Sequence, residues 1–248
     1  MSSNQVILRV EALNKSFGGL QAVRDLSLEI SAHKVTGLIG PNGAGKTTFF
    51  NLVSGIYSAD SGKIVFWDER IDSLKPHQIA QAGITRTFQT LNNFPRLSVF
   101  ENVRAGIITR GLPLEQEETE VYKMLQLLGI SDLAASGVGE ITPEARRLVE
   151  VGRALIARPK LVLFDEIMAG FSEQETVNLI GIIGDYARRG TTFCIVGHTM
   201  RAIMSVSDEL IVMHEGTKFE QGTPAQIQAS RAVHKIYLGE STDDDPSA

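Results

Sequence analysis

At 248 residues with 43% hydrophobic side chains, the chain is long and apolar enough for one large domain or two modest ones. A formal net charge of −5 gives it no general basic face, which argues against a dedicated nucleic-acid-binding protein. Its single cysteine, Cys194, excludes an internal disulfide, and the apolar run TTFCIV predicts a core residue in a reducing, cytoplasmic setting. Because no run of about 18 apolar residues occurs, we expect neither a signal peptide nor a transmembrane segment.

The first quarter of the chain alternates as β-strands do. VILRVEAL, AVRDLSLEI, KVTGLIG and KIVFW are separated by glycine-containing turns, with one predicted helix at about residues 46–54. Residues 98–130 instead carry apolar side chains at helical spacing. From residue 142 onward, helices alternate with strands and end in a hairpin. This alternation is typical of a mostly parallel sheet that is covered on both faces.

A phosphate-binding pattern follows the apolar strand VTGLI. GPNGAGKTT fits G-x-x-x-x-G-K-[ST], in which glycines let backbone N–H groups turn toward phosphate oxygens at the positive end of a helix. Lys46 is expected to reach the β- and γ-phosphates of ATP, and the Thr47 hydroxyl to complete Mg²⁺ coordination. The candidate nucleotide-binding residues are Gly40, Pro41, Asn42, Gly43, Ala44, Gly45, Lys46, Thr47 and Thr48.

Two adjacent acids end the apolar strand LVLFDE. Asp165 and Glu166 lie at its carboxyl end, where open α/β sheets bind their ligands. Asp165 is expected to hold Mg²⁺ through water, and Glu166 to orient and deprotonate the attacking water. The alternative is a pair of acids that merely ends a strand at the surface, and the upstream phosphate loop disfavours it. No N-K-x-D motif occurs, since the Asn-Lys pair continues as NKSF, so GTP is disfavoured.

In this order, the motifs resemble the ATP-binding cassette of ABC transporters over nearly the whole chain. ITRTFQTLNNFPRLSVFENV resembles the glutamine loop of the family, which implies that Gln89 senses Mg²⁺ and the attacking water. CIVGHTM resembles the switch region, which implies that His198 contacts the γ-phosphate. LNKSFGGL resembles the adenine-stacking loop, with Phe17 as the aromatic platform, and a core position for Phe17 is the alternative.

The resemblance also implies the fold and its subdivision. We expect an α/β P-loop NTPase (RecA-like) with a mostly parallel sheet core, an N-terminal antiparallel β subdomain and an inserted α-helical subdomain. One ABC ATPase domain is predicted over residues 1–240. Its core and β subdomain comprise about residues 1–90 and 160–240, and its helical subdomain about residues 91–159. The acidic residues 241–248 are expected to be a disordered tail.

Two further segments resemble a subgroup of importers. RTFQ with LSVFENV, and the ending HKIYLGE, resemble the ATPases of branched-chain amino acid importers and their amide or urea relatives. This implies an ATP-hydrolysing subunit on the cytoplasmic face of the inner membrane, held there by permease subunits. A second ATPase subunit and a separate solute-binding protein would complete the import complex, and no nucleic acid would take part. The alternatives are a low-turnover nucleotide-binding regulatory module and the ATPase of another ABC system.

The signature motif of the family is degenerate in this chain. L-S-G-G-Q aligns with ITPEA, in which Thr142 keeps the hydroxyl, Pro143 lacks an N–H donor and Glu144 replaces a glycine. In the family this helix entrance caps the γ-phosphate that the opposite subunit holds. A carboxylate about 5 Å from that phosphate costs roughly 3 kcal/mol at an effective dielectric near 20, before the side chain swings away or protonates. We therefore expect a heterodimer rather than a homodimer, with one impaired composite site.

Overall fold

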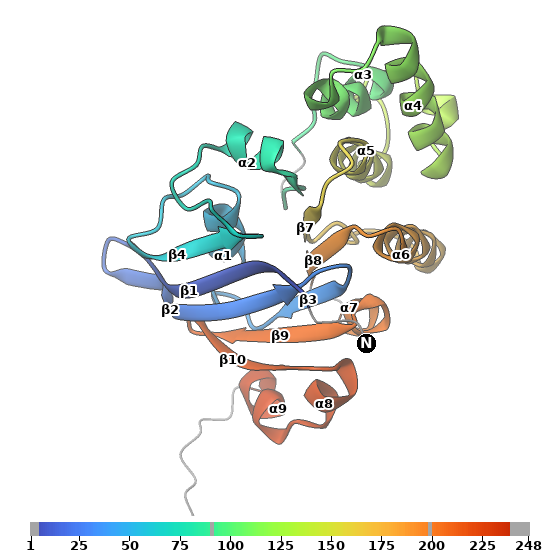
Figure 1. Cartoon of the computed structure of the whole chain (residues 1–248). Helices are drawn as coiled ribbons and strands as arrows, with labels where there is room; N and C mark the ends of the chain where they lie inside the picture. Colours follow the sequence, from blue (N-terminus) through green and yellow to red (C-terminus); the bar gives the residue numbers. More distant parts are fainter. Residues whose placement is uncertain (1–4, 90–91, 198–199, 239–248) are drawn as a thin grey trace, which may run out of the picture.

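The computed structural model describes residues 5–89, 92–197 and 200–238. An antiparallel sheet near the N-terminus lies beside a larger, mostly parallel sheet, and one group of helices lies to the side of both (Figure 1). Within the described residues, no helix is both long enough and apolar enough to cross a membrane.

The antiparallel sheet has the strand order β2-β1-β4-β5. Its first two strands form a hairpin in which Phe17 pairs with Leu20 across the turn Gly18–Gly19. Alternation buries one set of side chains, including Leu8, Val10 and Leu13, and exposes the other, so one face of this sheet packs on the core. The strands are β1 (Val6–Phe17), β2 (Leu20–Ser31), β4 (Ser61–Phe66) and β5 (Glu69–Arg70).

The larger sheet has the order β10-β9-β3-β8-β7-β6, parallel except for the edge strand β10. All residues of the three central strands are buried, which explains why their sequences are continuous apolar runs rather than alternating ones. The strands are β3 (Val35–Ile39), β6 (Ile84–Arg86), β7 (Leu161–Asp165), β8 (Thr192–Val196), β9 (Glu209–His214) and β10 (Thr217–Gly222).

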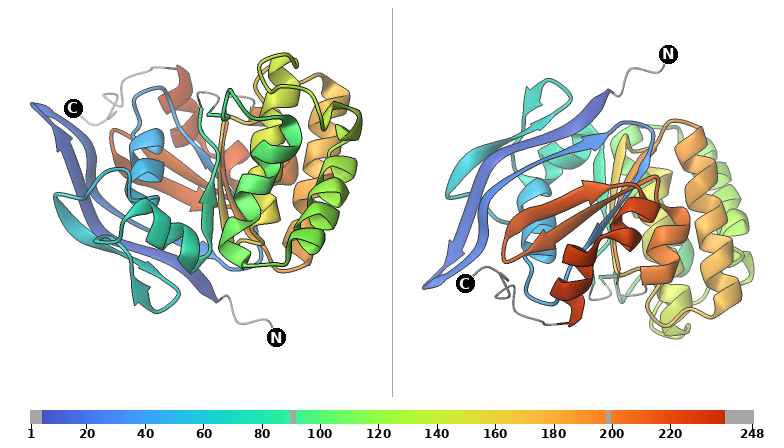
Figure 2. Two further views of the ribbon diagram at one scale, coloured as in Figure 1. Left: turned by 90° about the horizontal axis from the view of Figure 1, so that it is seen from above. Right: turned by 90° about the horizontal axis from the view of Figure 1, so that it is seen from below.

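Helices cover both faces of this sheet, and two hydrophobic cores result (Figure 2). Along β7, Val162 and Phe164 belong to one core, whereas Leu161 and Leu163 belong to the other. Helices α3, α4 and α5 pack on one another as a group. The α-helices are α1 (Lys46–Val53), α2 (Pro76–Ala82), α3 (Val99–Arg104), α4 (Leu114–Leu127), α5 (Pro143–Ile156), α6 (Glu173–Arg188), α7 (Met200–Val206), α8 (Pro224–Ala229) and α9 (Arg231–Leu238).

The fold class agrees with the sequence prediction, with two local differences. The sequence pattern does not predict α2, because Ile79 is the one buried apolar residue in its seven residues and gives little helical periodicity. The helical pattern that begins at residue 98 divides into α3 and a 3₁₀ helix, Ala105–Arg110. There Gly106 lies so close to α5 that an added Cβ would stand 2.1 Å from the Arg153 carbonyl oxygen. Cys194 is fully buried in β8, as expected of a core residue.

Candidate nucleotide-binding site

The glycine-rich loop connects β3 to α1 and needs glycine at two close approaches. Gly40 and Gly45 have φ angles of +151° and +96°, in the region that side chains disfavour. A Cβ at Gly40 would stand 2.1 Å from the Met213 carbonyl oxygen, and one at Gly45 would stand 2.4 Å from the Ala22 carbonyl oxygen. The loop is therefore wedged between β9 and β2, which fixes its shape.

Lys46 begins α1 and is 7% exposed. Its Nζ donates hydrogen bonds to the carbonyl oxygens of Gly40 at 2.7 Å and Pro41 at 2.9 Å, so the ammonium is held by its own loop. Burial lowers the pKa of Lys46, and the negative charges of Glu166 and Asp165 oppose that shift. The loop therefore presents a fixed cation within the field of the two acids that end β7.

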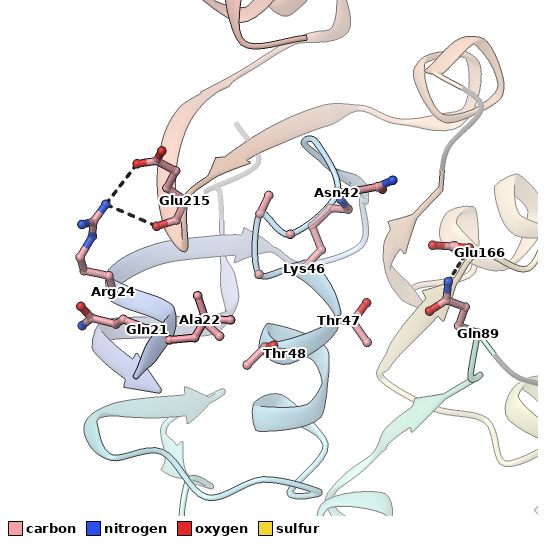
Figure 3. Close-up of a pocket in the computed structure, with 14 residues that line it drawn as sticks. Gln21, Ala22, Arg24, Asn42, Lys46, Thr47, Thr48, Gln89, Glu166 and Glu215 are labelled. Atoms are coloured by element: carbon pink, nitrogen blue, oxygen red, sulfur yellow. Dashed lines mark hydrogen bonds and ion pairs between the residues drawn. The ribbon is translucent and has the colours of Figure 1, made fainter. Parts of the chain in front are cut away.

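A pocket of about 740 Å³ opens beside this loop, large enough for a nucleotide-sized molecule (Figure 3). At one end, Arg24 and Glu215 form an ion pair at 3.6 Å, and at the other end Gln89 donates to Glu166. Lys46 and Thr47 lie between these two pairs. The pocket is lined by Leu20, Gln21, Ala22, Arg24, Asn42, Gly43, Ala44, Gly45, Lys46, Thr47, Thr48, Gln89, Glu166 and Glu215.

Glu166 has an unusual backbone conformation for a residue with a side chain. Its φ is +53°, directly after the end of β7. Its N–H donates to the Val196 carbonyl oxygen at 2.9 Å, and its own carbonyl oxygen accepts from Arg147 Nη1 at 3.3 Å. The Glu166 Oε2 atom accepts from Gln89 Nε2 at 3.1 Å. Neighbouring elements thus hold the chain in a turn that brings the second acid into the pocket.

Asp165 forms a buried ion pair with Arg86, a residue that the sequence analysis does not single out. Arg86 Nη2 lies 3.0 Å from Asp165 Oδ2, and the two side chains are 5% and 0% exposed. Arg86 Nη1 also donates to Asn51 Oδ1 on α1 at 2.6 Å and to the Oγ of Ser54, the C-cap residue of α1, at 3.0 Å. Arg86 therefore connects β6, α1 and the first acid of β7.

This pair shifts the pKa values of both of its members. Burial raises the pKa of the Asp165 carboxyl, and the charge of Arg86 opposes that shift. Burial likewise lowers the pKa of the Arg86 guanidinium, and Asp165 opposes it. The sequence could have indicated Arg86 only indirectly. An Asp165 buried at the end of an apolar strand needs a cation nearby, and a neighbouring strand can supply one.

The three residues predicted to hold Mg²⁺ line one cavity of about 330 Å³. Thr47, Gln89 and Asp165 meet there beside Arg86. Asp165 Oδ1 is buried and has no hydrogen-bond partner within the described residues. A hydroxyl, an amide oxygen and a carboxylate are oxygen ligands of the kind that Mg²⁺ prefers, so this set of side chains fits that ion. The described residues contain no cluster of three acidic, histidine or cysteine side chains for a metal, so water and phosphate oxygens would supply the other ligands.

Phe17 does not line the main pocket in this conformation. Its ring, 41% exposed, packs edge-on against Tyr57 at 5.0 Å between centroids, with Lys15 Nζ 5.5 Å from its centre. Leu20, from the same hairpin, lines the pocket instead. Adenine stacking on Phe17 therefore stays a prediction.

Thr142 and Glu144 lie at the entrance of α5 and also do not line the pocket beside the glycine-rich loop. Thr142 Oγ1 accepts from the Ala145 N–H at 3.2 Å and caps the helix. The Glu144 carboxylate lies near the loop after β7, where an added Cβ at Gly170 would stand 3.7 Å from its Oε1. The remaining predicted residue, His198, lies outside the described residues.

A glycine-rich loop between a buried strand and a helix, facing two acids at the end of a parallel strand, defines the class of P-loop nucleoside triphosphatases. The family profile described as ABC transporter matches residues 23–169. The chain belongs to this family and is an ATPase subunit of the ABC type.

Two curated relatives illustrate the range of systems that the chain resembles. The high-affinity branched-chain amino acid transport ATP-binding protein BraF of Pseudomonas aeruginosa is 33% identical, covering 95% of this chain and 98% of the relative. The lipopolysaccharide export system ATP-binding protein LptB of Haemophilus influenzae is 36% identical, covering 94% and 98%. Sequence identity alone therefore does not separate import from export.

Solved structures agree with the fold. A nucleotide-free ATP-binding cassette from an ABC transporter has a TM-score of 0.85 and 30% identity, covering 95% of this chain and all of that one. The ADP conformation of the cassette MJ1267 has a TM-score of 0.83 and 31% identity, covering 95% and 99%.

Proposed function

We propose that this chain binds Mg·ATP and hydrolyses it to drive an ABC import complex. The observation that carries the proposal is that Lys46 and Glu166 line one pocket beside the glycine-rich loop, while Asp165 lines a second cavity that shares Thr47 and Gln89 with it. The loop and Lys46 would bind the phosphates, and Gln21, which lies near Arg24 at the end of the pocket away from Glu166, would lie toward the adenine (Figure 3). Thr47, Gln89 and Asp165 would hold Mg²⁺, which when bound offsets negative charge on the phosphate oxygens.

Glu166 is the proposed general base. Its carboxylate is held by Gln89 at 3.1 Å and lies across the pocket from the phosphate loop (Figure 3). The side chains of Gln89 and Glu166 would orient a water between Glu166 and the terminal phosphate, and Glu166 would accept a proton from that water. His198 is proposed to contact the γ-phosphate, and Phe17 to stack on the adenine after the hairpin at Gly18–Gly19 moves.

The transported solute is proposed to be a branched-chain amino acid. The BraF relative and the segments RTFQ and HKIYLGE support this choice over lipopolysaccharide export. The complex would include permease subunits, a second ATPase subunit and a separate solute-binding protein, with this chain peripheral on the cytoplasmic side. Purifying the native complex and testing which amino acids stimulate its ATPase activity would decide the solute. Stimulation by no amino acid would contradict the proposal that the solute is a branched-chain amino acid.

We also propose that the second ATPase subunit is a paralogue rather than an identical copy. Thr142 and Glu144 are absent from the chain's own pocket, which is consistent with their facing a nucleotide held by another subunit. A dimeric ABC cassette with bound ADP and phosphate is among the solved structures of this fold. In such a pair, this chain's α5 entrance would bring Glu144 toward the partner's γ-phosphate and weaken that one composite site.

Replacing Glu144 with glycine is expected to raise ATP hydrolysis by homodimers of this chain about tenfold to a hundredfold. The change removes a like-charge contact of roughly 3 kcal/mol, part of which the wild-type side chain avoids by moving away. Steady-state ATPase rates of the purified chain would measure the gain. Glu115→Gly is the matched control, because it also removes an acid from the first turn of a helix, α4. Ordinary hydrolysis by wild-type homodimers, with no gain in Glu144→Gly, would contradict the asymmetric site.

A further inference from the structure

A second pocket, of about 610 Å³, lies at the opposite end of the strands from Asp165 and Glu166. It is formed where α5 ends and β7 begins, where α6 ends and β8 begins, and along the last turns of α4. Its volume is within the range of small-molecule sites. The charged residues in its lining are Arg110, Glu120, Lys123, Arg158, Lys160 and Arg189.

The lining is strongly basic, although the chain as a whole is acidic. Five cations and one carboxylate give this pocket a formal charge of +4, against −5 for the whole sequence. Helix dipoles account for a part of this pattern, since cations are favoured where α5 and α6 end. They do not account for Lys123, which lies on α4 before its last turn.

One ion-pair network fixes the floor of the pocket. Glu120 accepts from Arg158 Nη2 at 2.7 Å and Arg110 Nη1 at 3.3 Å, and Arg110 also donates to the Ile156 carbonyl oxygen at 3.1 Å. The Arg110 side chain is only 14% exposed. Arg158 has a φ of +53°, in the left-handed region that arginine seldom adopts. Arg110 and Arg158 are thus held in place by contacts with Glu120 and with the end of α5.

Two cations of the pocket remain unpaired. Within the described part of the chain, the side chains of Lys160 and Arg189 make no hydrogen bond or ion pair. The half-buried Tyr186 adds a hydroxyl to the same lining, also without a hydrogen bond among the described residues. Two free cations and a hydroxyl donor around a preformed cavity are the groups that bind a compact anion with several charges.

We propose that this pocket binds a phosphate-bearing anion, at a site separate from the nucleotide pocket and independent of the function proposed above. The cluster of five cations around this cavity favours a compact group with several negative charges, such as a phosphate or diphosphate. Either a free phosphate compound or the headgroup of an acidic lipid supplies that chemistry.

The first test is calorimetric titration of inorganic pyrophosphate into the purified chain and two charge-reversal variants. Lys123→Glu, on α4, and Arg189→Glu, directly after α6, are each expected to weaken binding at this site about tenfold or more. Lys123 is 69% exposed, so its replacement leaves the core intact, and thermal melting would verify folding of both variants. Arg188→Glu is the matched control, because it makes the same charge change next to Arg189 but does not line the pocket.

Pyrophosphate can also bind to the glycine-rich loop, but none of the three variants changes that loop. A loss seen in Arg189→Glu and Lys123→Glu but not in Arg188→Glu therefore belongs to the second pocket. Equal losses in Arg188→Glu and Arg189→Glu, or no loss in either pocket variant, would overturn the proposal. A sedimentation test with vesicles of phosphatidylcholine, with and without phosphatidic acid, distinguishes the sources. Binding to acidic vesicles that Arg189→Glu abolishes and Arg188→Glu retains assigns the lipid headgroup, whereas pyrophosphate binding alone assigns a free anion.

Discussion

Glu166→Gln is expected to lower the rate of ATP hydrolysis by about 10²–10⁴-fold while leaving nucleotide binding nearly unchanged. Glutamine has the same shape and keeps an oxygen that accepts from Gln89, as Glu166 does at 3.1 Å, but it cannot take the proton of an attacking water. Single-turnover hydrolysis and the Kd of ATP, measured on the same preparation, would separate the chemical step from binding.

Glu144→Gln is the control for this loss. It also replaces a carboxylate with an amide, but outside the residues that line the nucleotide pocket, so hydrolysis in its own pocket should not fall. The comparison also decides between an ATPase and a low-turnover regulatory module. If wild type and Glu166→Gln hydrolyse ATP at the same slow rate, Glu166 is not the base and the regulatory alternative is favoured.

The sequence predicts the fold well where buried strands and tight turns require a particular local composition, such as an apolar run or a glycine. β3, β7 and β8 are continuous apolar runs because both of their faces are covered, and this pattern requires no knowledge of the tertiary structure. The glycine-rich loop is equally visible, since Gly40 and Gly45 meet neighbouring carbonyl oxygens too closely for any side chain. By contrast, α2 is short and has a single buried apolar residue, Ile79, so its periodicity is too weak to predict.

The parts of the site that depend on contacts between distant segments could not be predicted from local sequence patterns. Arg86 is one basic residue in an ordinary short strand until β6 pairs with β7 and brings it to Asp165. The positive φ of Glu166 likewise follows from contacts to Val196 and Arg147, which no local pattern specifies. Phe17 matches a motif, yet its ring position depends on Tyr57, forty residues away in the sequence.

Arg86→Ala is expected to lower the free energy of unfolding of the nucleotide-free chain by about 3–5 kcal/mol, because it leaves the Asp165 carboxylate buried without its cation. Urea unfolding followed by circular dichroism would measure the change. Arg9→Ala is the matched control: Arg9 also pairs with an acid at 2.7 Å, but both side chains are about half exposed and solvent screens the pair, so the loss of stability should be far smaller. A loss in Arg86→Ala no larger than this would contradict the buried-charge argument.

The double variant Arg86→Ala, Asp165→Asn tests the cause of that loss. If an uncompensated charge is responsible, removing the charge should restore part of the stability, whereas lost packing of Arg86 on Phe50 and Phe88 would not be restored. The same pair bears on function, because Arg86 binds Asp165 Oδ2 and leaves Oδ1 without a partner in the described structure. In Arg86→Ala, the Asp165 carboxylate would lose the hydrogen bond that holds Oδ2 and so keeps Oδ1 available for Mg²⁺ or its water ligands. Arg86→Ala should therefore raise the Mg²⁺ concentration required for half-maximal hydrolysis.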